Sequence, residues 1–330
     1  DRPAPPPPAG PAPPDNAPLV EVVLALYRPP LPALERQVAS VLDQRGCAVR
    51  VLLVADGPLP DNAAIEALVR SDPRLWLVRR AERRGPAATF LEGLGTALEL
   101  PAAQHPPRHL AFCDQDDRWD GDKLATLLAR LQATGAGCVH GDVRVVDAGL
   151  RALHPSLFAL ERRDRDPPLA ALLFRNHATG MTMLCDARTA RLLARLAPLR
   201  PDRWLHDHFA AFVARATTGL AFEPRPLADY VQHGGNLVGA GRPRWRWPSG
   251  GFLAPQGAVA RHLRQLAALV TALLAEPALS EDGRRALLAL DAALARRGLA
   301  AVPPALRLVR QCPAMPRDVA ARLVWSRVLP

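Results

Sequence analysis

The chain has 330 residues, of which 49% are hydrophobic, and its formal net charge is +10. This length is sufficient for one large domain with an appendage or for two domains, and the hydrophobic share allows a sizeable core. No uncharged apolar run reaches the roughly 18 residues that a membrane span requires, and the first residues lack a signal-peptide pattern, so we expect a cytoplasmic protein without a transmembrane helix. Five widely spaced cysteines without a C-x-x-C pair argue against a disulfide framework and a zinc site.

The positive charge favours an anionic partner, which can be a nucleoside diphosphate, an acidic membrane face or a nucleic acid. Aromatic residues make up only 5% of the chain, and we find no stacking platform or recognition helix, so we expect no nucleic-acid partner. Taken alone, the charge supports only the general hypothesis of a basic adaptor for membranes or nucleic acids.

The N-terminal half alternates predicted strands with predicted helices. Residues 1–18 are dominated by Pro and Ala and are expected to form a disordered arm, because they offer almost nothing to bury. Short apolar runs bounded by Pro, Gly or acidic residues predict buried strands, and apolar spacings of three and four residues predict helices. This alternation predicts an α/β fold with a mostly parallel sheet flanked by helices. The expected strands are 19–26, 49–55, 75–79 and 109–113, and the expected helices are 34–42, 63–69 and 87–98.

The residues that follow the predicted strands are candidates for ligand binding, since in open sheets of this type the ligand crevice lies beyond the carboxyl ends of the strands. Tyr27 follows the first expected strand, Asp56 the second, and Asp114 with Asp116 the fourth. We therefore expect these four side chains to line one crevice. Neither a G-x-G-x-x-G sequence nor a Walker A sequence is present, so a dinucleotide cofactor and a P-loop NTPase are not expected.

The most informative stretch is HLAFCDQDDRWDGDK, residues 109–123, in which an apolar run precedes a burst of carboxylates. In an extended segment Asp114 and Asp116 point the same way, while Gln115 points elsewhere. Converging carboxylates repel each other unless a hard cation lies between them, and Mg²⁺ is commonly held by one or two carboxylates together with substrate phosphates. The stretch therefore predicts a Mg²⁺ or Mn²⁺ site with a diphosphate ligand, unless its acidic residues serve only as turn residues and caps of the helical segment 124–131.

The second half has a less regular pattern. Cys138–Val146 predicts a short strand pair, and Asn176–Cys185 predicts a turn that leads into a strand. Tyr230–Ala240 is expected to end a strand and enter a Gly-rich loop. Residues 255–330 are helical in pattern and rich in arginine.

A predicted helix at Arg200–Thr217 carries three polar residues in its first turn, His206, Asp207 and His208. The two histidines stand two residues apart and face different sides of a helix, so they are poor joint metal ligands. Asp207 is the residue of interest in this turn.

Several segments together resemble a known family. DQDDRWDGDKL, residues 114–124, is similar to the D-Q-D-D-x-W-x-x-x-K-L motif of the bacterial rhamnosyltransferase-like group within the family 2 glycosyltransferases of the GT-A fold. The resemblance covers roughly residues 19–330. Further segments of that group occur in the same order, namely VASVLDQ (38–44), Asp56-Gly57, NHATGMTML (176–184), His206-Asp207 and QHGGNLVGA (232–240).

The resemblance implies an activity and a role for each matching residue. It implies that a sugar, with rhamnose as one candidate, passes from a dTDP- or UDP-sugar to a hydroxyl of a lipid-linked or polysaccharide acceptor, with inversion at the anomeric carbon. Tyr27 and Asp56 would contact the nucleotide, Asp114 would lie near the ribose and the metal, and Asp116 would bind the metal. Asp207 matches the position of the general base, a role that needs hydrogen-bond reach to the acceptor hydroxyl.

Several candidates also have ordinary structural explanations. Asp207 suits a helix N-cap, and Trp119 is either a core residue or a platform for the sugar. Gln115 and Lys123 are candidate contacts of the nucleotide sugar. Lys123 could also lie along a helix face, but as the only lysine in the chain it favours a phosphate or structural contact. His233 is either a metal or phosphate ligand or a loop histidine without a function.

The chain also departs from the family pattern. Ala55 precedes Asp56 where a pair of aspartates is usual, Arg84 and Thr89 stand where asparagines are common, and Val231 stands where an arginine is frequent. These differences put the identity and affinity of the donor in question more than the class of reaction.

We expect three segments: the arm at 1–18, a GT-A domain at 19–252, and a helical C-terminal extension at 253–330. Within the domain, residues 19–120 form the nucleotide-binding half and residues 121–252 the acceptor half. The arginines of the extension form either a solvated face or a peripheral contact with the inner face of the plasma membrane.

Two rival hypotheses keep the same fold but change the function. The first is a non-catalytic member that binds a nucleotide sugar or assembles with partners through the same crevice. The second is a nucleotidyltransferase, which would release pyrophosphate in place of a nucleoside diphosphate.

Overall fold

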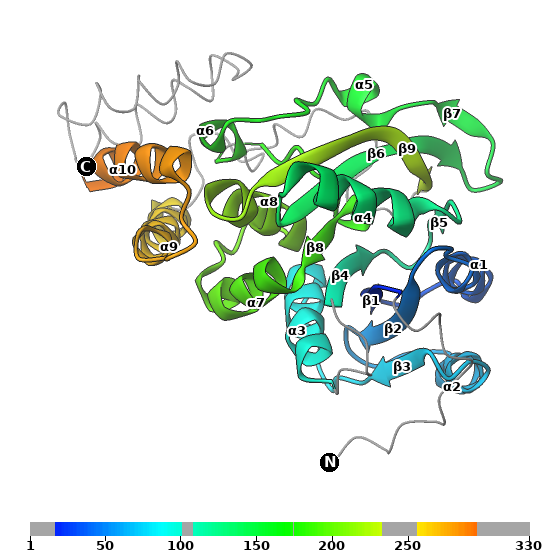
Figure 1. The fold of residues 1–330 in the computed structure, drawn as a ribbon. Helices are drawn as coiled ribbons and strands as arrows, with labels where there is room; N and C mark the ends of the chain where they lie inside the picture. The colour runs from blue at the N-terminus through cyan, green and yellow to red at the C-terminus, as the bar shows by residue number, and fades with distance from the viewer. Residues whose placement is uncertain (1–16, 101–107, 174, 233–255, 296–330) are drawn as a thin grey trace.

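The computed structural model describes residues 17–100, 108–173, 175–232 and 256–295. These residues form one nine-stranded sheet with helices on both of its faces (Figure 1). The strands follow one another across the sheet in the order β3-β2-β1-β4-β8-β6-β9-β5, and β7 pairs with β6 outside this path. The expected α/β class is therefore confirmed.

Four parallel strands form the N-terminal half of the sheet. Each strand is joined to the next along the chain by a crossover connection that contains a helix, as parallel pairing requires. The ends of these four strands lie within one or two residues of the ends that the sequence predicts. The strands are β1 Leu19–Leu26, β2 Ala48–Ala55, β3 Leu75–Val78 and β4 Arg108–Cys113, and the helices between them are α1 Leu31–Leu42, α2 Asn62–Arg70 and α3 Pro86–Glu99.

The C-terminal half of the sheet mixes strand directions. β8 runs antiparallel to both β4 and β6, whereas β6 and β9 run parallel to each other. The predicted strand pair at Cys138–Val146 is wrong, because β6 is a single ten-residue strand whose register against β9 shifts on both sides of Asp142. The strands of this half are β5 Arg118–Trp119, β6 Cys138–Asp147, β7 Ala152–His154, β8 Leu184–Asp186 and β9 Leu220–Gln232.

The helices of the second half cover both faces and continue into a C-terminal pair. The predicted helix at Arg200–Thr217 begins only at His206, and Pro201 to Leu205 form an irregular approach to it. The elements are α4 Lys123–Thr134, α5 Leu157–Glu161, α6 Leu169–Leu172, η1 Gly180–Thr182, α7 Ala187–Leu196, η2 Ala197–Leu199, α8 His206–Ala216, α9 Gln256–Leu274 and α10 Glu281–Ala295.

The two faces of the sheet support two hydrophobic clusters, as the alternation of side chains along a strand requires. In β1, Val22 and Leu24 pack with α1, α2 and α4, while Val23 packs with α3, α7 and α8. α3 approaches the sheet closely at Gly93, where a Cβ would lie 2.6 Å from the Val23 side chain and 2.9 Å from that of Val54. A larger residue at position 93 would therefore push α3 away from the sheet.

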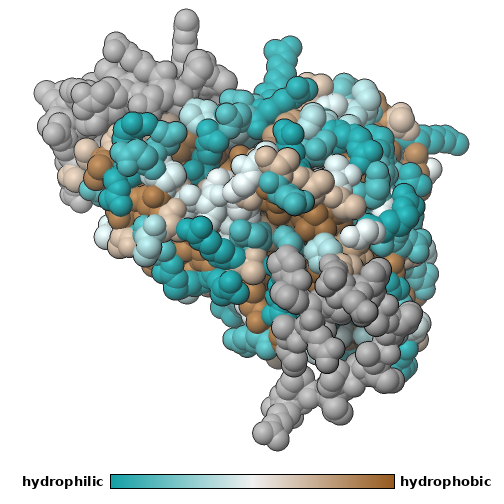
Figure 2. Space-filling model, in the orientation of Figure 1, coloured by the Kyte–Doolittle hydropathy of each residue, from teal (hydrophilic) through white to brown (hydrophobic). Residues whose placement is uncertain are grey.

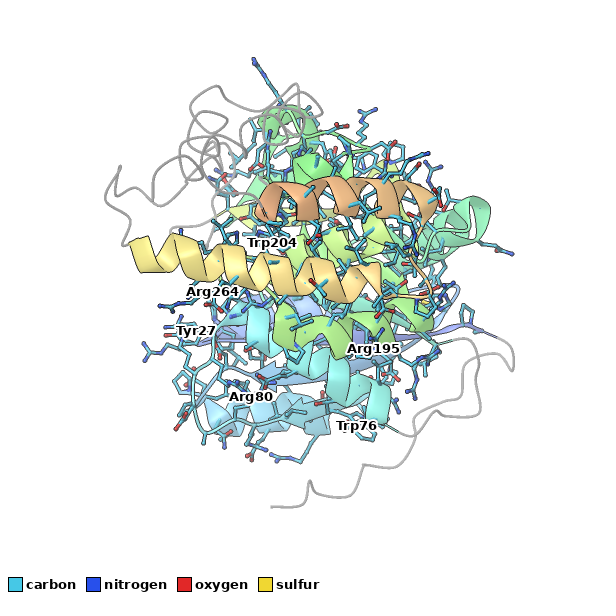
Figure 3. The ribbon with its side chains drawn as sticks, turned by 90° about the vertical axis from the view of Figure 1, so that its left-hand side faces the viewer. Tyr27, Trp76, Arg80, Arg195, Trp204 and Arg264 are labelled. Atoms are coloured by element: carbon cyan, nitrogen blue, oxygen red, sulfur yellow. The ribbon has the colours of Figure 1, made fainter. Side chains whose placement is uncertain are left out.

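The C-terminal pair α9 and α10 packs against the same side as α7 and α8 (Figure 3). Trp204, beside α9 in that view, stacks on His208 with ring centroids 4.4 Å apart and lies 6.3 Å from the ring of His262 on α9. Leu269 and Val270 of α9 are completely buried in the same cluster. The apolar face of α9 is therefore used within the fold.

On the surface turned to the viewer in Figure 2, hydrophobic patches are interrupted by hydrophilic ones. No helix among the described residues combines the length and the hydropathy that crossing a membrane requires. Several predicted features lie outside the described residues: most of the arm at 1–18, the Gly-rich loop from His233, and the C-terminal segment from residue 296.

Buried histidines make the stability of this fold sensitive to acid. His140 on β6 has no exposed surface, packs against the rings of Phe158 and Phe222, and has no hydrogen-bond partner for either ring nitrogen among the described residues. Burial lowers the pKa of His140 from 6.5 to about 3, and it lowers the pKa of His177 to a similar value. Between the unfolded pKa of 6.5 and the folded pKa of about 3, the unfolded chain binds more protons than the folded chain. The free energy of unfolding therefore falls as the pH falls through this range.

We expect His140→Leu to flatten this dependence on pH. Between about pH 7.5 and about pH 5 the variant should lose about 2 kcal/mol less free energy of unfolding than wild type, since it no longer exposes a histidine that takes up a proton. Urea titrations at the two pH values measure the difference. Equal losses in the two proteins would show that His140 is not buried in its neutral form.

Candidate active site

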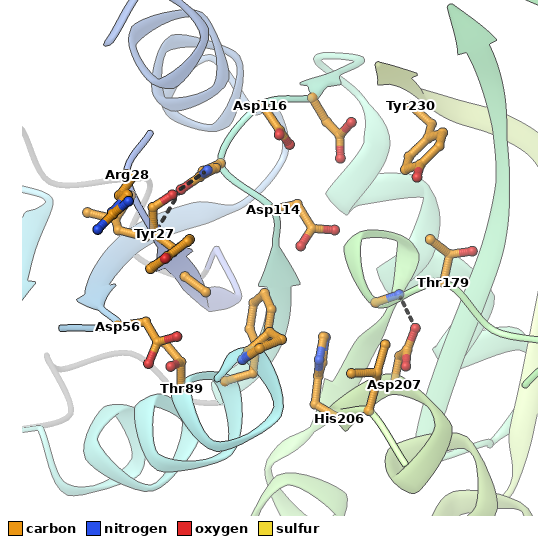
Figure 4. Close-up of a pocket in the computed structure, with 18 of the residues that line it drawn as sticks. Tyr27, Arg28, Asp56, Thr89, Asp114, Asp116, Thr179, His206, Asp207 and Tyr230 are labelled. Carbon is orange, nitrogen blue, oxygen red and sulfur yellow. Dashed lines mark hydrogen bonds between the residues drawn. The ribbon is translucent and has the colours of Figure 1, made fainter. Parts of the chain in front are cut away.

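A pocket of about 540 Å³ opens beyond the carboxyl ends of β1, β2 and β4, where the sequence predicts the ligand crevice (Figure 4). Tyr27 and Asp56 lie on one side of it, Thr179, His206 and Asp207 lie on the other, and Asp114 lies between them. The remaining residues that line the pocket are Ala25, Leu26, Arg28, Pro30, Arg83, Pro86, Thr89, Phe90, Gln115, Asp116, Asp117, Gly180, Leu205 and Tyr230.

Tyr27 forms one wall of the pocket, and Gln115 fixes its backbone. The Tyr27 N–H donates to Gln115 Oε1 at 2.8 Å, and Gln115 Nε2 donates to the Tyr27 carbonyl at 3.1 Å. The exposed ring of Tyr27 lies under the guanidinium of Arg83, with the Cζ atom 4.1 Å from the ring centroid. Gln115 therefore joins the ends of β1 and β4, and its amide is engaged by the protein itself.

Asp56 is 5% exposed and holds the loop that leads into α3. Its Oδ1 atom accepts hydrogen bonds from the N–H groups of Arg84, at 2.7 Å, and Gly85, at 3.0 Å. Gly85 has a φ of 84°, in the left-handed region that glycine tolerates, and it is the N-cap residue of α3. The carboxylate thus has a structural role in addition to its place in the pocket wall.

Three carboxylates of one short segment, Asp114, Asp116 and Asp117, border the pocket, although the sequence singles out only the first two. Residues 114–117 all line it, because the chain bends at Gln115 and Asp116 and does not continue as a strand. Asp117 is 1% exposed, and its Oδ1 atom accepts from the N–H of Val231 at 2.9 Å. Burial, followed by the charges of Asp114 and Asp116, raises the pKa of Asp117 well above its usual value. Asp117 therefore favours its protonated form beside the other two carboxyl groups.

The segment VASVLDQ holds this acidic stretch in place. The hydroxyl of Ser40 on α1 accepts from the Trp119 N–H at 3.1 Å. The Gln44 side chain donates to the Asp120 carbonyl at 2.8 Å and accepts from the Leu124 N–H at 2.9 Å. These bonds fix both the end of the acidic stretch and the start of α4.

Trp119 and Lys123 do not line the pocket. Trp119 is 3% exposed and packs in the hydrophobic cluster under α1 and α4. Lys123 is 1% exposed, donates from Nζ to the Met181 carbonyl at 2.7 Å, and places its ammonium over the Trp119 ring. Burial lowers the pKa of Lys123 well below its usual value. Both positions favour the structural explanation of these residues over contact with a ligand.

Asp207 enters the pocket from the first turn of α8. It is 5% exposed, its Oδ2 atom accepts from the Gly180 N–H at 3.2 Å, and its Oδ1 atom accepts from the N–H of His208 at 2.7 Å. These two bonds hold the carboxylate against the segment NHATGMTML. Since Leu205 precedes the helix as its N-cap residue, Asp207 is not the N-cap itself.

The metal prediction rests on Asp114 and Asp116. Within the described ranges, no three His, Cys, Asp or Glu side chains come close enough together to bind a metal ion. Two pocket carboxylates are nevertheless sufficient for Mg²⁺ or Mn²⁺ when substrate phosphates supply further oxygens. The charges of Asp114 and Asp116 are, after burial, causes of the raised pKa of Asp117, and an ion held by these two residues would offset their charge. His233, the third predicted ligand, lies outside the described residues.

Several pocket residues have no predicted role. Asp117, Thr179 and His206 belong to segments with a recognisable pattern, but the pattern does not show that these side chains reach a ligand. Arg83 gives no signal, because an exposed arginine before a helix is ordinary in a chain with 42 basic residues.

We expect Asp56→Ala to destabilise the protein by about 1.5 to 3 kcal/mol without any ligand, because two backbone N–H groups lose a charged acceptor. Asp56→Asn, which keeps an acceptor oxygen, should lose less. Urea denaturation of the unliganded proteins measures both changes. Wild-type stability in the alanine variant would show that the loop at 83–85 does not depend on this carboxylate.

Comparison with known proteins identifies the family to which this architecture belongs. The model of the family described as "Glycosyl transferase family 2" matches residues 22–189, just over half of the chain. Over 139 residues the chain is 30% identical to the succinoglycan biosynthesis protein ExoO of Rhizobium meliloti (strain 1021), an alignment that covers 42% of this chain and 37% of that protein. The chain thus matches well under half of the length of this relative.

Two solved structures share the fold at low sequence identity. S. aureus TarS 1-349 in complex with UDP-GlcNAc has a TM-score of 0.54 and 12% identity, over 92% of this chain and 83% of that chain. The same protein in complex with UDP has a TM-score of 0.51 and 13% identity, over 82% of this chain and 70% of that chain. These likenesses confirm the expected GT-A type of α/β fold. Together with the family match, they show that this chain belongs to glycosyl transferase family 2.

Proposed function

We propose that the protein is an inverting glycosyltransferase that moves a sugar from a nucleoside diphosphate to a hydroxyl of a glycan or lipid-linked acceptor. The observation that carries the proposal is the shared pocket, in which the acidic pair Asp114 and Asp116 and the carboxylate of Asp207 face one volume of about 540 Å³. A pocket of this size suits a ligand of drug-like dimensions.

The donor would lie across the pocket from Tyr27 towards Asp207. The Tyr27 ring and the Arg83 guanidinium offer a flat surface for a base, and Asp56 lies beside them. The complexes of TarS with UDP and UDP-GlcNAc motivate a uridine nucleotide, and the resemblance to rhamnosyltransferase-like proteins motivates dTDP-rhamnose as the other candidate.

A divalent cation is part of the proposal, with Asp114 and Asp116 as the residues that would hold it. Such an ion supplies positive charge that offsets the charge of the leaving diphosphate. Carboxylate oxygens are ligands that Mg²⁺ and Mn²⁺ both accept, so the choice between the two ions is left to experiment.

Asp207 is the proposed general base. As the acceptor oxygen forms its bond to the anomeric carbon, the proton of that hydroxyl passes to the Asp207 carboxylate and the bond to the diphosphate breaks. The backbone N–H groups of Gly180 and His208 orient the carboxylate for this transfer. Attack on the face opposite the diphosphate inverts the anomeric centre.

The acceptor is proposed to be part of a surface glycan, since the relative ExoO is named for succinoglycan biosynthesis. We further propose a cytoplasmic location, with any contact at the inner membrane face made by arginines of the C-terminal extension. The apolar side chains Leu269, Val270 and Leu273 of α9 are buried within the fold, so electrostatic contact fits such binding better than insertion of this helix.

The first test is thermal stabilisation by UDP, dTDP and GDP, each with and without Mn²⁺ or Mg²⁺. A nucleotide at 100 times its Kd should add about 2.7 kcal/mol to the free energy of unfolding. We expect one nucleotide to stabilise wild type in the presence of the metal, and Asp116→Ala to lose the effect. Asp122→Ala is the matched control, because Asp122 belongs to the same acidic stretch but does not line the pocket.

Stabilisation that needs no metal, or that survives Asp116→Ala, would contradict the proposed metal site. Stabilisation by none of the nucleotides would contradict the proposed function. Release of pyrophosphate from a nucleoside triphosphate and a sugar phosphate would favour a nucleotidyltransferase.

We expect Asp207→Asn to slow sugar transfer by about 10²- to 10⁴-fold while nucleotide binding is retained, because the amide accepts no proton from the acceptor. Asp282→Asn in the first turn of α10 is a control for the loss of a helix N-terminal carboxylate outside the pocket. Transfer rates with the donor that the first test identifies provide the measurement. Unchanged transfer by Asp207→Asn would remove this residue from the mechanism.

A further inference from the structure

His206 lines the pocket next to Asp207, on the side away from Tyr27, and its surroundings are unusual (Figure 4). Its ring stacks on Phe90, with centroids 3.8 Å apart and an interplanar angle of 28°, and the ring of Phe112 meets its edge at 4.8 Å. Gly180 leaves room on another side, since a Cβ at that position would lie 2.4 Å from His206 Nε2. The rings of Phe90 and Phe112, together with the space that glycine leaves at position 180, therefore determine how the imidazole is oriented.

Neither ring nitrogen of His206 has a hydrogen-bond partner among the described residues, although the side chain is only 5% exposed. A buried polar group without a partner costs about 1 to 3 kcal/mol. A phenyl ring would pack against Phe90 and Phe112 in the same position without this cost. Because the ring also lines the pocket, a partner that enters the pocket can supply the missing hydrogen bond.

Two other buried histidines each lack at least one of the two features of His206, the unpartnered nitrogens or the place in the pocket wall. His208, in the same turn, is bonded through Nε2 to the Leu172 carbonyl and stacks on Trp204 away from the pocket. His140 also has unpartnered nitrogens, but it does not line the pocket. Of the described pocket residues, only Asp117 and His206 have a buried side-chain polar atom without a partner.

We propose that the His206 imidazole hydrogen-bonds a hydroxyl of the sugar carried by the donor and so contributes to the choice of sugar. The inference rests on the proposed function. A base against Tyr27 and a diphosphate near Asp114 leave the sugar at the end where His206 and Asp207 lie side by side.

The protonation state of the ring fits a hydroxyl partner. Burial lowers the pKa of His206 to about 4, so the ring is neutral near pH 7 and presents one N–H donor and one acceptor nitrogen. A sugar hydroxyl both donates and accepts, so it can satisfy either nitrogen. A ring without charge offers no ion pair to a phosphate, which separates this role from that of a diphosphate contact.

The test compares the affinity for a nucleoside diphosphate with the affinity for the corresponding nucleotide sugar, measured by calorimetry with Mn²⁺ present. The probes are UDP with UDP-GlcNAc and UDP-glucose, dTDP with dTDP-rhamnose, and GDP with GDP-mannose. The variant is His206→Phe, which keeps the aromatic stack and removes both nitrogens. His140→Leu is the control for the loss of a buried histidine outside the pocket.

We expect the nucleotide sugar to bind wild type more tightly than the diphosphate alone. His206→Phe should lower the affinity for the nucleotide sugar by about 10-fold and keep the affinity for the diphosphate within about 2-fold of wild type. His140→Leu should change neither affinity. If His206→Phe does not fold, His206→Leu, which is smaller, provides the same comparison.

Three results would overturn the inference while leaving the proposed function intact: a sugar that adds no affinity in wild type, an unchanged nucleotide sugar affinity in His206→Phe, or an equal loss for both ligands. Failure of wild type to bind any of the diphosphates would overturn the proposed function and this inference together.

Discussion

The site depends on the parallel register of three strands. Leu26 of β1 pairs with Ala55 of β2, and Leu24 of β1 pairs with Cys113 of β4, so the three strands end within a few residues of one another. Parallel strands place their carboxyl ends on one edge of a sheet, and the first polar residue after each of them faces the same space. A slip of register in any of these pairs would separate the pocket residues and turn the buried side chains to the wrong face.

The second half of the chain completes the pocket through buried polar contacts. Asp207 accepts from the Gly180 N–H, and Asp117 accepts from the Val231 N–H, so the acidic stretch, η1, α8 and β9 are joined at the same place. These groups are almost completely removed from solvent, which makes each bond costly to lose. The geometry of the site therefore depends on the packing between the two halves of the sheet.

Local sequence patterns predict the elements whose structure is set locally, and they miss the features that distant contacts decide. Buried parallel strands are continuous apolar runs, which is why β1, β2, β3 and β4 are found within a residue or two. The glycine in β6 suggests a turn, but pairing with β8 and β9 keeps the strand continuous. The position of Asp207 in the pocket follows a motif, whereas the burial of Trp119 and Lys123 depends on α1 and η1, whose proximity no local pattern reveals.

The burial of Lys123 has a practical consequence. It is the only lysine in the chain, and only 1% of it is exposed, so the cationic surface consists of arginine guanidinium groups. Burial lowers the pKa of this amine in the folded protein and also shields it from reagents, so the amine reacts as an ordinary lysine only when solvent reaches it. Acylation of the Lys123 side chain would therefore report local opening of the acidic stretch and α4. The folded protein exposes no lysine side chain to lysine-directed cross-linkers.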